Sequence, residues 1–217
     1  MTDVINKQTL SEQIYQILRQ DILTQQLKSG EKLTLQILKD RFNVSHTPIR
    51  EALTRLVEDD LVTYHSNIGI TVVSLSQRDV RELFELSGDL DCLALRYATR
   101  GTVAKDFLAE LDENVTRSGK CLEENQMDCW SDLSDRFHLI LYKFADNTRL
   151  EKAAQKLRAQ TTLVTNRYQL QEENLRQIQH DHEEILKALQ VGDIDHAIER
   201  VRRHLDNDLK LALQVVD

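Results

Sequence analysis

The scarcity of helix-breaking residues is the feature of this sequence that most constrains its fold. The 217 residues include only six glycines and one proline, whereas Leu, Glu, Gln, Ala, Lys and Arg, which favour helices, are plentiful. Hydrophobic residues make up 41% of the chain, which is enough to build packed cores. We therefore expect a mainly α-helical protein, and the length allows two modest domains or one large one.

The charge distribution restricts how such a chain could bind nucleic acid. The formal net charge is −8, of which residues 1–75 carry −1 and residues 76–217 carry −7. Non-specific affinity for nucleic acid depends on Lys and Arg at phosphates. Any such contact must therefore come from a focused patch in the first third of the chain.

The hydropathy pattern and the cysteine spacing indicate where the protein is located in the cell and whether its thiols are reduced. We find no apolar run of membrane-spanning length and no signal-peptide pattern at the start, so we expect a cytoplasmic protein without membrane contact. The cysteines Cys92, Cys121 and Cys129 form neither a CxxC pair nor an even set. They are interpreted as reduced thiols in helices.

The first third of the chain mixes helical and strand patterns. Apolar residues recur at helical spacing over about residues 9–26, and Thr34 can cap a short helix that runs to Phe42. Asn43 tolerates a left-handed turn, Ser45 is a good N-cap, and Pro48 suits the first turn of the next helix. Two β-branched runs, 61–65 and 70–74, flank the hairpin signal Ser66-Asn-Ile-Gly. Short helix, tight turn, helix and hairpin together predict a winged helix-turn-helix in residues 1–75.

The remainder, residues 76–217, contains one helical pattern after another. Ser76 is a plausible N-cap, and helices are expected at about 76–100, 103–125, 128–145, 148–171, 173–191 and 193–215. Six helices with short connections predict an antiparallel α-helical bundle. The predicted fold class is therefore mainly α, with a winged helix-turn-helix in front of a six-helix bundle.

The second helix of a helix-turn-helix presents its N-terminal residues to base edges in the major groove. Arg50 suits a guanine edge or a phosphate, and Ser45, His46 and Thr47 suit base or phosphate contacts. The small residues Ser66, Asn67 and Gly69 would let the wing tip approach the DNA backbone or minor groove. The alternative is an amphipathic helical hairpin that serves only for packing.

Three histidines, His138, His182 and His204, each lie within the apolar stripe of a predicted bundle helix. One interpretation is three buried polar side chains that are satisfied within the core. The other is a divalent metal site, because neutral imidazoles that converge in a dry core suit Zn²⁺ or Ni²⁺. The spacing alone leaves both open.

Several phrases of the sequence resemble a known family. The segments LSEQIYQILRQDIL, LKSGEKL and FNVSHTPIREALTRLVEDDLV resemble the GntR superfamily of bacterial regulators, and VS-x-TPIREAL at Val44 to Leu53 is the most specific phrase. The segments RELFELSGDLDCLALRYA, DRFHLILYKFADN, HDHEEILKALQVGD and HAIERVRRHL resemble its FadR-type branch, which has an FCD effector domain. The resemblance covers nearly the whole chain.

For the DNA-binding half, the resemblance implies contacts at Ser45, His46, Thr47, Arg50, Ser66 and Asn67, and also at Gln36 and Arg55. His46 and Gln36 stand where the family often has Arg, so the operator need not follow the family's better-known sites. Asp60 replaces a common Gly after the recognition helix, but Asp can occupy such a turn.

For the helical half, the resemblance implies a divalent metal held by one Asp and three His, with His138, His182 and His204 as the histidines. The usual Asp position is Ser134 here, and Asp135 is the candidate substitute. The family's effector-binding Arg corresponds to Gly88 and the acidic residue after it to Asp91. Arg96, Arg158 and Arg167 are the possible replacements for a carboxylate clamp, and Arg167 is the one we select.

The predicted function is therefore a homodimeric, ligand-responsive regulator, most simply a repressor, that binds double-stranded operator DNA. Its helical domain, residues 76–217, would provide dimerisation and bind a divalent metal, a small organic acid, or both. One alternative is a metal-dependent enzyme, because three His with an open position is also a catalytic zinc arrangement. The other is a structural metal in a domain that serves only for dimerisation.

Overall fold

The computed structural model describes residues 8–101, 104–168 and 171–216. The chain forms two compact units, Met1–Leu75 and Ser76–Asp217. Each unit is described by itself below.

The first unit is built on three helices, α1 (Leu10–Leu23), α2 (Leu35–Phe42) and α3 (His46–Glu58). The Thr34 hydroxyl caps α2 by accepting from the backbone N–H of Ile37 at 3.2 Å. Asn43 ends α2 in the left-handed conformation, with φ 51° and ψ 48°, and this turn leads directly into α3. α1 packs against α3, and the fully buried side chains between them include Ile14, Leu18, Ile49 and Leu53.

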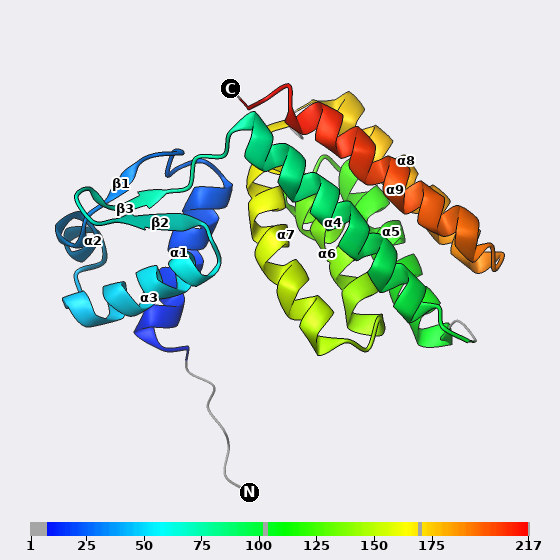
Figure 1. The fold of residues 1–217 in the computed structure, drawn as a ribbon, viewed down its shortest axis with the longest axis horizontal. Helices are drawn as coiled ribbons and strands as arrows, with labels where there is room; N and C mark the ends of the chain where they lie inside the picture. Colours follow the sequence, from blue (N-terminus) through cyan, green and yellow to red (C-terminus); the bar gives the residue numbers. More distant parts are fainter. Residues whose placement is uncertain (1–7, 102–103, 169–170, 217) are drawn as a thin grey trace, which may run out of the picture. The chain divides into compact units, whose positions relative to one another are not determined.

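A small antiparallel sheet completes this unit. The strands β2 (Val62–His65) and β3 (Gly69–Val72) form the predicted hairpin, with Val62 opposite Val72 and His65 opposite Gly69. A two-residue strand, β1 (Lys32–Leu33), pairs with the other edge of β3 and gives the strand order β1-β3-β2. The sequence patterns did not predict this third strand. The winged helix-turn-helix predicted for the first third of the chain is confirmed (Figure 1).

The second unit is an α-helical bundle, as predicted. Among the described residues it contains α4 (Gln77–Ala98), α5 (Lys105–Glu123), α6 (Met127–Phe144), α7 (Thr148–Tyr168), α8 (Glu172–Gln190) and α9 (Ile194–Ala212). Residues 102–103 and 169–170, at the ends of two predicted helices, lie outside the described residues.

α4 begins with a complete capping box. The Ser76 hydroxyl accepts from the backbone N–H of Asp79, and the Asp79 carboxylate accepts from the backbone N–H of Ser76. In the bundle, α4 packs against α6, α7 and α9, and α5 packs against α6 and α8. The helices thus surround a core in which α6, α7 and α9 all face α4 (Figure 1). None of the described helices combines the length and apolar character needed to cross a membrane.

The interpretation of all three cysteines as reduced thiols is wrong for two of them. Cys121, near the end of α5, and Cys129, at the start of α6, form a disulfide, with their Cα atoms 6.0 Å apart. The reason is the tight connection between α5 and α6, which brings residues eight positions apart opposite one another. Cys92 is a free thiol, and burial raises its pKa.

Candidate DNA interface and candidate metal centre

The N-terminal turn of α3 forms an exposed polar surface. Ser45 is the N-cap residue by position, although its side chain makes no capping hydrogen bond in the described part of the chain. Ser45, His46, Thr47 and Arg50 are all exposed, while Ile49 on the inner face is fully buried. The helix therefore directs its short polar groups and one guanidinium outward, as DNA reading requires.

The other predicted DNA contacts lie on neighbouring elements of this unit. Gln36, in the first turn of α2, is exposed, and its amide donates to Asp40 Oδ1 at 2.9 Å. Ser66 and Asn67 are exposed at the hairpin tip between β2 and β3. Gly69 adopts a φ of +100°, which a residue with a side chain rarely reaches, so the hairpin needs glycine there.

Arg55, a predicted DNA contact, makes its contacts in the structure within the first unit. Its guanidinium donates to Glu12 of α1 and lies over the Tyr15 ring, 3.9 Å from the centroid. The hydrogen bond to Glu12 is the main reason that the pKa of Arg55 is raised. We propose that the charge of Arg55 serves to hold α1 against α3 rather than to contact DNA.

The bundle brings the three predicted histidines together. His138 of α6, His182 of α8 and His204 of α9 are 3%, 1% and 1% exposed, and we refer to them as the histidine cluster. One ring nitrogen of each lies within 4.8 Å of the others, and the two Nε2 atoms of His182 and His204 are 3.3 Å apart. The His182 ring stacks on Phe137 at a centroid distance of 4.0 Å, which fixes its orientation.

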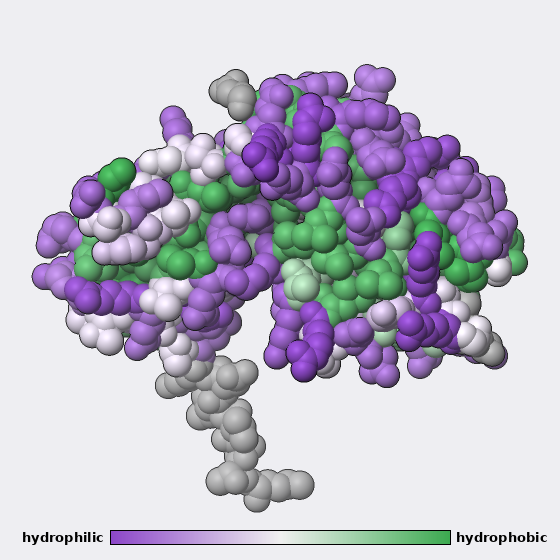
Figure 2. Space-filling model, viewed as in Figure 1, coloured by the Kyte–Doolittle hydropathy of each residue, from purple (hydrophilic) through white to green (hydrophobic). Residues whose placement is uncertain are grey.

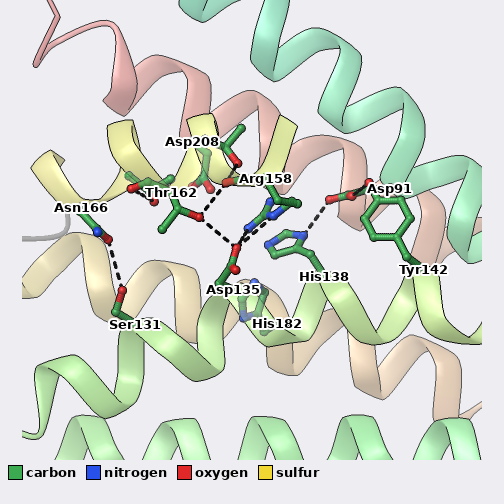
Figure 3. Close-up of polar contacts among 12 residues, drawn as sticks. Asp91, Ser131, Asp135, His138, Tyr142, Arg158, Thr162, Asn166, His182 and Asp208 are labelled. Atoms are coloured by element: carbon green, nitrogen blue, oxygen red, sulfur yellow. Dashed lines mark hydrogen bonds and ion pairs between the residues drawn. The ribbon is translucent and has the colours of Figure 1, made fainter. Parts of the chain in front are cut away.

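Asp91 of α4 orients the first of these histidines. His138 Nδ1 donates to Asp91 Oδ2 at 2.7 Å, and the Tyr142 hydroxyl donates to the other carboxylate oxygen (Figure 3). Burial, helped by the nearby positive charge of Arg158, lowers the pKa of His138 well below its usual value. With Nδ1 used as the donor, the neutral ring keeps the lone pair of Nε2 for a ligand.

The other side of the cluster contains two carboxylates. His204 Nδ1 lies 3.5 Å from Asp181 Oδ2, and its Nε2 lies 3.7 Å from Asp208 Oδ2. Burial acts to lower the pKa of His204, but Asp208 and Asp181 outweigh it and the pKa is raised. For His182, burial and the neighbouring His204 both lower the pKa well below the usual value.

Asp135 does not join the histidine cluster. Its Oδ1 accepts from Arg158 Nη2 at 2.6 Å and from Arg158 Nε at 3.0 Å, so the carboxylate is turned toward α7 (Figure 3). We therefore do not retain Asp135 as a metal ligand. Ser134, at the usual Asp position, is buried.

Of the two candidate clamp arginines on α7, Arg158 is the more buried, and Arg167, the one selected from the sequence, stays a prediction. The side chain of Arg158 is 9% exposed, and although burial opposes it, the charges of Asp135 and Asp91 raise its pKa. Arg167 is only half-buried, in the last turn of α7. The sequence named Arg158 as one of three possibilities but could not select it, because the choice depends on how α7 is rotated.

Gly88, where the family has an effector-binding Arg, lies where α4 and α9 pack closely together, and little space is left for a side chain. A Cβ at this position would lie 3.2 Å from Arg202 Nη1 and 3.4 Å from Leu205 Cβ. A larger side chain could enter only if these neighbours moved. The position is therefore used for packing in this chain.

Sequence reasoning missed Asp181 and Asp208 as parts of the site. Asp208 lies four residues after His204 and Asp181 directly precedes His182, so the i,i+4 spacing was the available signal for Asp208. Burial raises the pKa of Asp208 against the influence of His204 and Arg158. Asp181, beside Nδ1 of His204, has the place of the usual outer partner of a metal-binding histidine, whereas Asp208 lies beside Nε2.

The donor set fits a divalent metal. Ligand nitrogens at zinc distances in a tetrahedral site are about 3.3–3.4 Å apart, and the Nε2 atoms of His182 and His204 already have this separation. Asp181 is the carboxylate nearest to His204 Nδ1, at 3.5 Å. Three Asp carboxylates, Asp91, Asp181 and Asp208, lie beside the cluster, and the charge of Arg158 is paired with Asp135, so the surroundings favour a cation.

A winged helix-turn-helix joined to a helical bundle with a polar core defines a two-domain transcription regulator. The chain belongs to the GntR family: the model for bacterial regulatory proteins of the gntR family matches residues 10–72, and the FCD domain model matches residues 82–207. The resemblance stated from the sequence is therefore confirmed.

Curated relatives agree with this assignment. The chain is 29% identical to the HTH-type transcriptional repressor RspR of Escherichia coli over 202 residues, which cover 91% of this chain and 86% of RspR. It is 25% identical to the HTH-type transcriptional repressor GlaR of the same species, with 93% and 95% covered. These relatives are transcription regulators and not enzymes, as predicted, so the enzyme alternative is set aside.

Solved structures show the same fold. McbR of Escherichia coli matches with a TM-score of 0.80 at 21% identity, covering 96% of this chain and 99% of that chain. A transcriptional regulator GntR from a Rhodococcus species matches with a TM-score of 0.79 at 20% identity, covering 95% and 99%.

Proposed function

We propose that this chain is a homodimeric repressor whose operator affinity changes when its FCD domain binds a divalent metal, Zn²⁺ or Ni²⁺. The single observation that carries this proposal is the buried histidine cluster in a domain attached to a winged helix-turn-helix. When bound, the metal would supply a Lewis-acidic centre held by His138, His182 and His204.

The chain's own residues account for the remaining requirements of such a site. Asp91 holds His138 in the tautomer that leaves Nε2 free, while Asp181 lies on the Nδ1 side of His204 and Asp208 on its Nε2 side. Because carboxylates outnumber guanidinium groups in this core, a cation is favoured over an anion as the first ligand. A small organic acid is the second ligand that we propose. Its carboxylate would bind the guanidinium of Arg158 in place of the carboxylate of Asp135.

α4 offers a route from the site to the DNA-binding unit. Its N-cap, Ser76, lies four residues after the end of β3, and the helix contributes Asp91 to the histidine cluster. A ligand that shifts Asp91 would act on the helix that follows the wing. Couplings of this kind are typically about 1–3 kcal/mol, which is a 5- to 150-fold change in operator affinity.

On DNA, we propose that Arg50 contacts a guanine edge or a phosphate. Additional contacts to bases or phosphates would come from the shorter side chains of Ser45, His46, Thr47 and Gln36. Ser66, Asn67 and Gly69 would meet the DNA backbone at the wing tip. A dimer would read two half-sites about 34 Å apart on one face of the duplex.

The test combines operator selection with metal titration. The full chain is used to select duplexes from a randomised library at about 0.15 M salt, a physiological ionic strength, and affinity for the enriched sequence is then measured with Zn²⁺, with Ni²⁺ and with a chelator. We expect an inverted repeat and at least a fivefold effect of metal. If no sequence is enriched under any of these conditions, the proposal of a DNA-binding repressor fails.

Two histidines on α8 provide a matched pair of variants. His182→Ala removes a member of the buried cluster, whereas His180→Ala removes an exposed imidazole two residues away. We expect His182→Ala to abolish stoichiometric metal binding and the metal effect on DNA, with His180→Ala unchanged. If metal stabilises the fold but leaves operator affinity the same, the metal is structural and the regulatory part of the proposal is wrong.

A further inference from the structure

The disulfide between Cys121 and Cys129 lies beside a hydrated turn. Cys121 is 8% exposed and Cys129 is half-buried. Figure 2 shows apolar surface in the part of the bundle where Figure 1 places α4 and α7. The turn between α5 and α6 differs from that surface, because every residue from 123 to 128 is exposed and all but Met127 are polar. Small polar reagents can therefore approach the disulfide from this turn.

A permanent disulfide is unusual in a DNA-binding regulator. Proteins that share a compartment with DNA meet thiol reductants, which keep most of their cysteines reduced. Disulfides that form under these conditions are usually transient and serve catalysis or redox sensing. Since this chain belongs to the GntR family of regulators, a bond that opens and closes explains the pair better than a permanent crosslink.

The backbone of the turn is held independently of the two sulfurs. Asn125 follows α5 in the left-handed conformation, with φ 55°, and its N–H donates to the carbonyl oxygen of Leu122 at 3.2 Å. The N–H of Gln126 donates to the carbonyl oxygen of Cys121 at 2.8 Å. These bonds keep the two cysteine positions close together when the sulfurs are not joined. The disulfide can therefore open and close again without unfolding of the turn.

Of the two thiols, Cys129 has the better position to attack an oxidant. It is the third residue of α6, and the positive end of a helix dipole favours a thiolate. The N-cap residue Gln126 makes no side-chain capping bond within the described part of the chain. Cys121 is buried near the negative end of α5, and both conditions disfavour its thiolate. Cys129 would thus react first, and Cys121 would close the bond.

The charges around the turn favour a neutral oxidant. The carboxylates of Glu123, Glu124 and Asp128 outnumber the one ammonium group, that of Lys120, in residues 120–128. This negative surface repels anionic oxidants such as glutathione disulfide, but it does not repel hydrogen peroxide. The carboxylates flank both cysteines, so they do not reverse the preference for Cys129.

We infer that Cys121 and Cys129 are a site of reversible oxidation by a neutral hydroperoxide such as hydrogen peroxide. The Cys129 thiolate attacks one peroxide oxygen, the O–O bond breaks, and the leaving hydroxide takes up the proton released by Cys129, which leaves a sulfenic acid. Cys121 then attacks the Cys129 sulfur, the S–O bond breaks, and hydroxide leaves as water with the proton of Cys121. Two thiols and one peroxide thus give one disulfide and two waters. A dithiol reopens the bond through a mixed disulfide and is itself oxidised.

The state of this pair would reach the histidine cluster through two helices. α6 continues from Cys129 to His138. On the other side, the Ser118 hydroxyl of α5 donates to Gln179 Oε1 of α8 at 2.7 Å, and His182 lies three residues after Gln179. Two free thiols cannot stand as close as two bonded sulfurs, so opening the bond shifts α6 against α5 and His138 against His182. This step rests on the proposed function.

The first test uses the full chain with Cys92→Ala, which removes the third thiol. After reduction and removal of the reductant, hydrogen peroxide should consume both remaining thiols. It should also lower the fluorescence of Trp130, which directly follows Cys129, because a disulfide quenches a nearby indole. Dithiothreitol should restore both signals in the folded protein. Thiols that stay free in peroxide, or a bond that opens only in denaturant, would overturn the inference.

The second test identifies the thiol that reacts first. In the Cys92→Ala background, Cys121→Ser keeps Cys129, which should form a sulfenic acid that a cyclic diketone traps. Cys129→Ser keeps the buried Cys121, which should be trapped about tenfold more slowly, because its thiolate is disfavoured. Circular dichroism checks that both variants fold. Equal trapping rates, or faster trapping at Cys121, would overturn the assignment of Cys129 as the attacking thiol.

The third test separates this inference from the proposed function. Adding Cys121→Ser and Cys129→Ser to Cys92→Ala imitates the open pair and leaves no thiol to bind metal. Affinity for Zn²⁺ and Ni²⁺ should be at least about fivefold lower than in oxidised Cys92→Ala, which is the lower end of typical couplings. Equal affinities would overturn the link to the histidine cluster. If neither protein binds either metal, the proposed function is refuted, and the reversible oxidation measured in the first test stands.

Discussion

Removing Arg158, the one guanidinium buried among the described residues of the bundle, should destabilise the bundle strongly. Arg158→Leu leaves Asp135, Asp91 and Asp208 without their shared counter-charge. Asp91 is fully buried and the Asp208 side chain is 9% exposed, so water cannot replace the lost interaction for these two. Breaking a buried ion pair by removing one partner costs about 3–5 kcal/mol. We expect a loss in this range at pH 7.

A second variant tests whether the loss comes from charge rather than packing. Asp135→Leu leaves Arg158 with the charges of Asp91 and Asp208 nearby, so Asp135→Leu alone should cost less than Arg158→Leu. The double variant removes both members of the pair and should be more stable than the sum of the single losses predicts. We expect a coupling free energy of about 1–2 kcal/mol, within the range found for residues in one network.

The assay is urea unfolding followed by the fluorescence of Trp130. This is the only tryptophan in the chain, it is 1% exposed, and it lies on α6 together with Asp135. Its signal therefore reports on the helical unit. If Arg158→Leu loses less than about 1 kcal/mol, or if the two substitutions are additive, the core charges are not organised around Arg158 and the reasoning is refuted.

Three shorter predictions concern the DNA-binding unit and the disulfide. Arg50→Ala should weaken operator binding by about 1–3 kcal/mol, measured by fluorescence anisotropy, because it removes the main exposed cation at the start of α3. Arg55→Ala should leave DNA contacts in place but lower the free energy of unfolding by about 0.5–1 kcal/mol, since its partly exposed pair with Glu12 and its stacking on Tyr15 are lost. Cys121→Ser should lower bundle stability by roughly 2–3 kcal/mol through loss of the short disulfide loop, and a reductant should produce the same change in the wild-type protein.

Each of these has an outcome that contradicts it. Unchanged operator affinity in Arg50→Ala would mean that specificity comes from other side chains. A loss of operator affinity in Arg55→Ala that exceeds its loss of stability would return Arg55 to the DNA interface. Equal stability of Cys121→Ser and wild type in the absence of reductant would show that the thiols of Cys121 and Cys129 are not joined.

Local signals in the sequence predict most of the fold. Caps and turns such as Thr34, Asn43 and Ser76 act within a few residues, so their roles could be inferred without the structure. β1 could not be predicted, because a two-residue strand carries no alternation and depends on pairing with β3, nearly 40 residues later. The disulfide was missed for a similar reason, since the turn between α5 and α6 decides which side chains meet.

For the site, the sequence predicts which residues of each helix are buried, but not which residues of different helices meet. Each histidine of the cluster stands in the apolar stripe of its own helix, so its burial follows from periodicity. Which carboxylate meets which imidazole depends on how helices rotate against one another. Asp91 and Asp135 are both plausible partners in sequence, but α7 brings Arg158 to Asp135 and leaves Asp91 to His138.

The capping box at Ser76 has a consequence for protein engineering. Both hydrogen bonds of the box are made between Ser76 and Asp79, so α4 starts from its own residues and needs nothing before Ser76 to define its first turn. A junction placed between Leu75 and Ser76 should therefore accept a foreign DNA-reading module without fraying the bundle. Exchanging modules at this peptide bond would redirect the same chemical input to a chosen promoter.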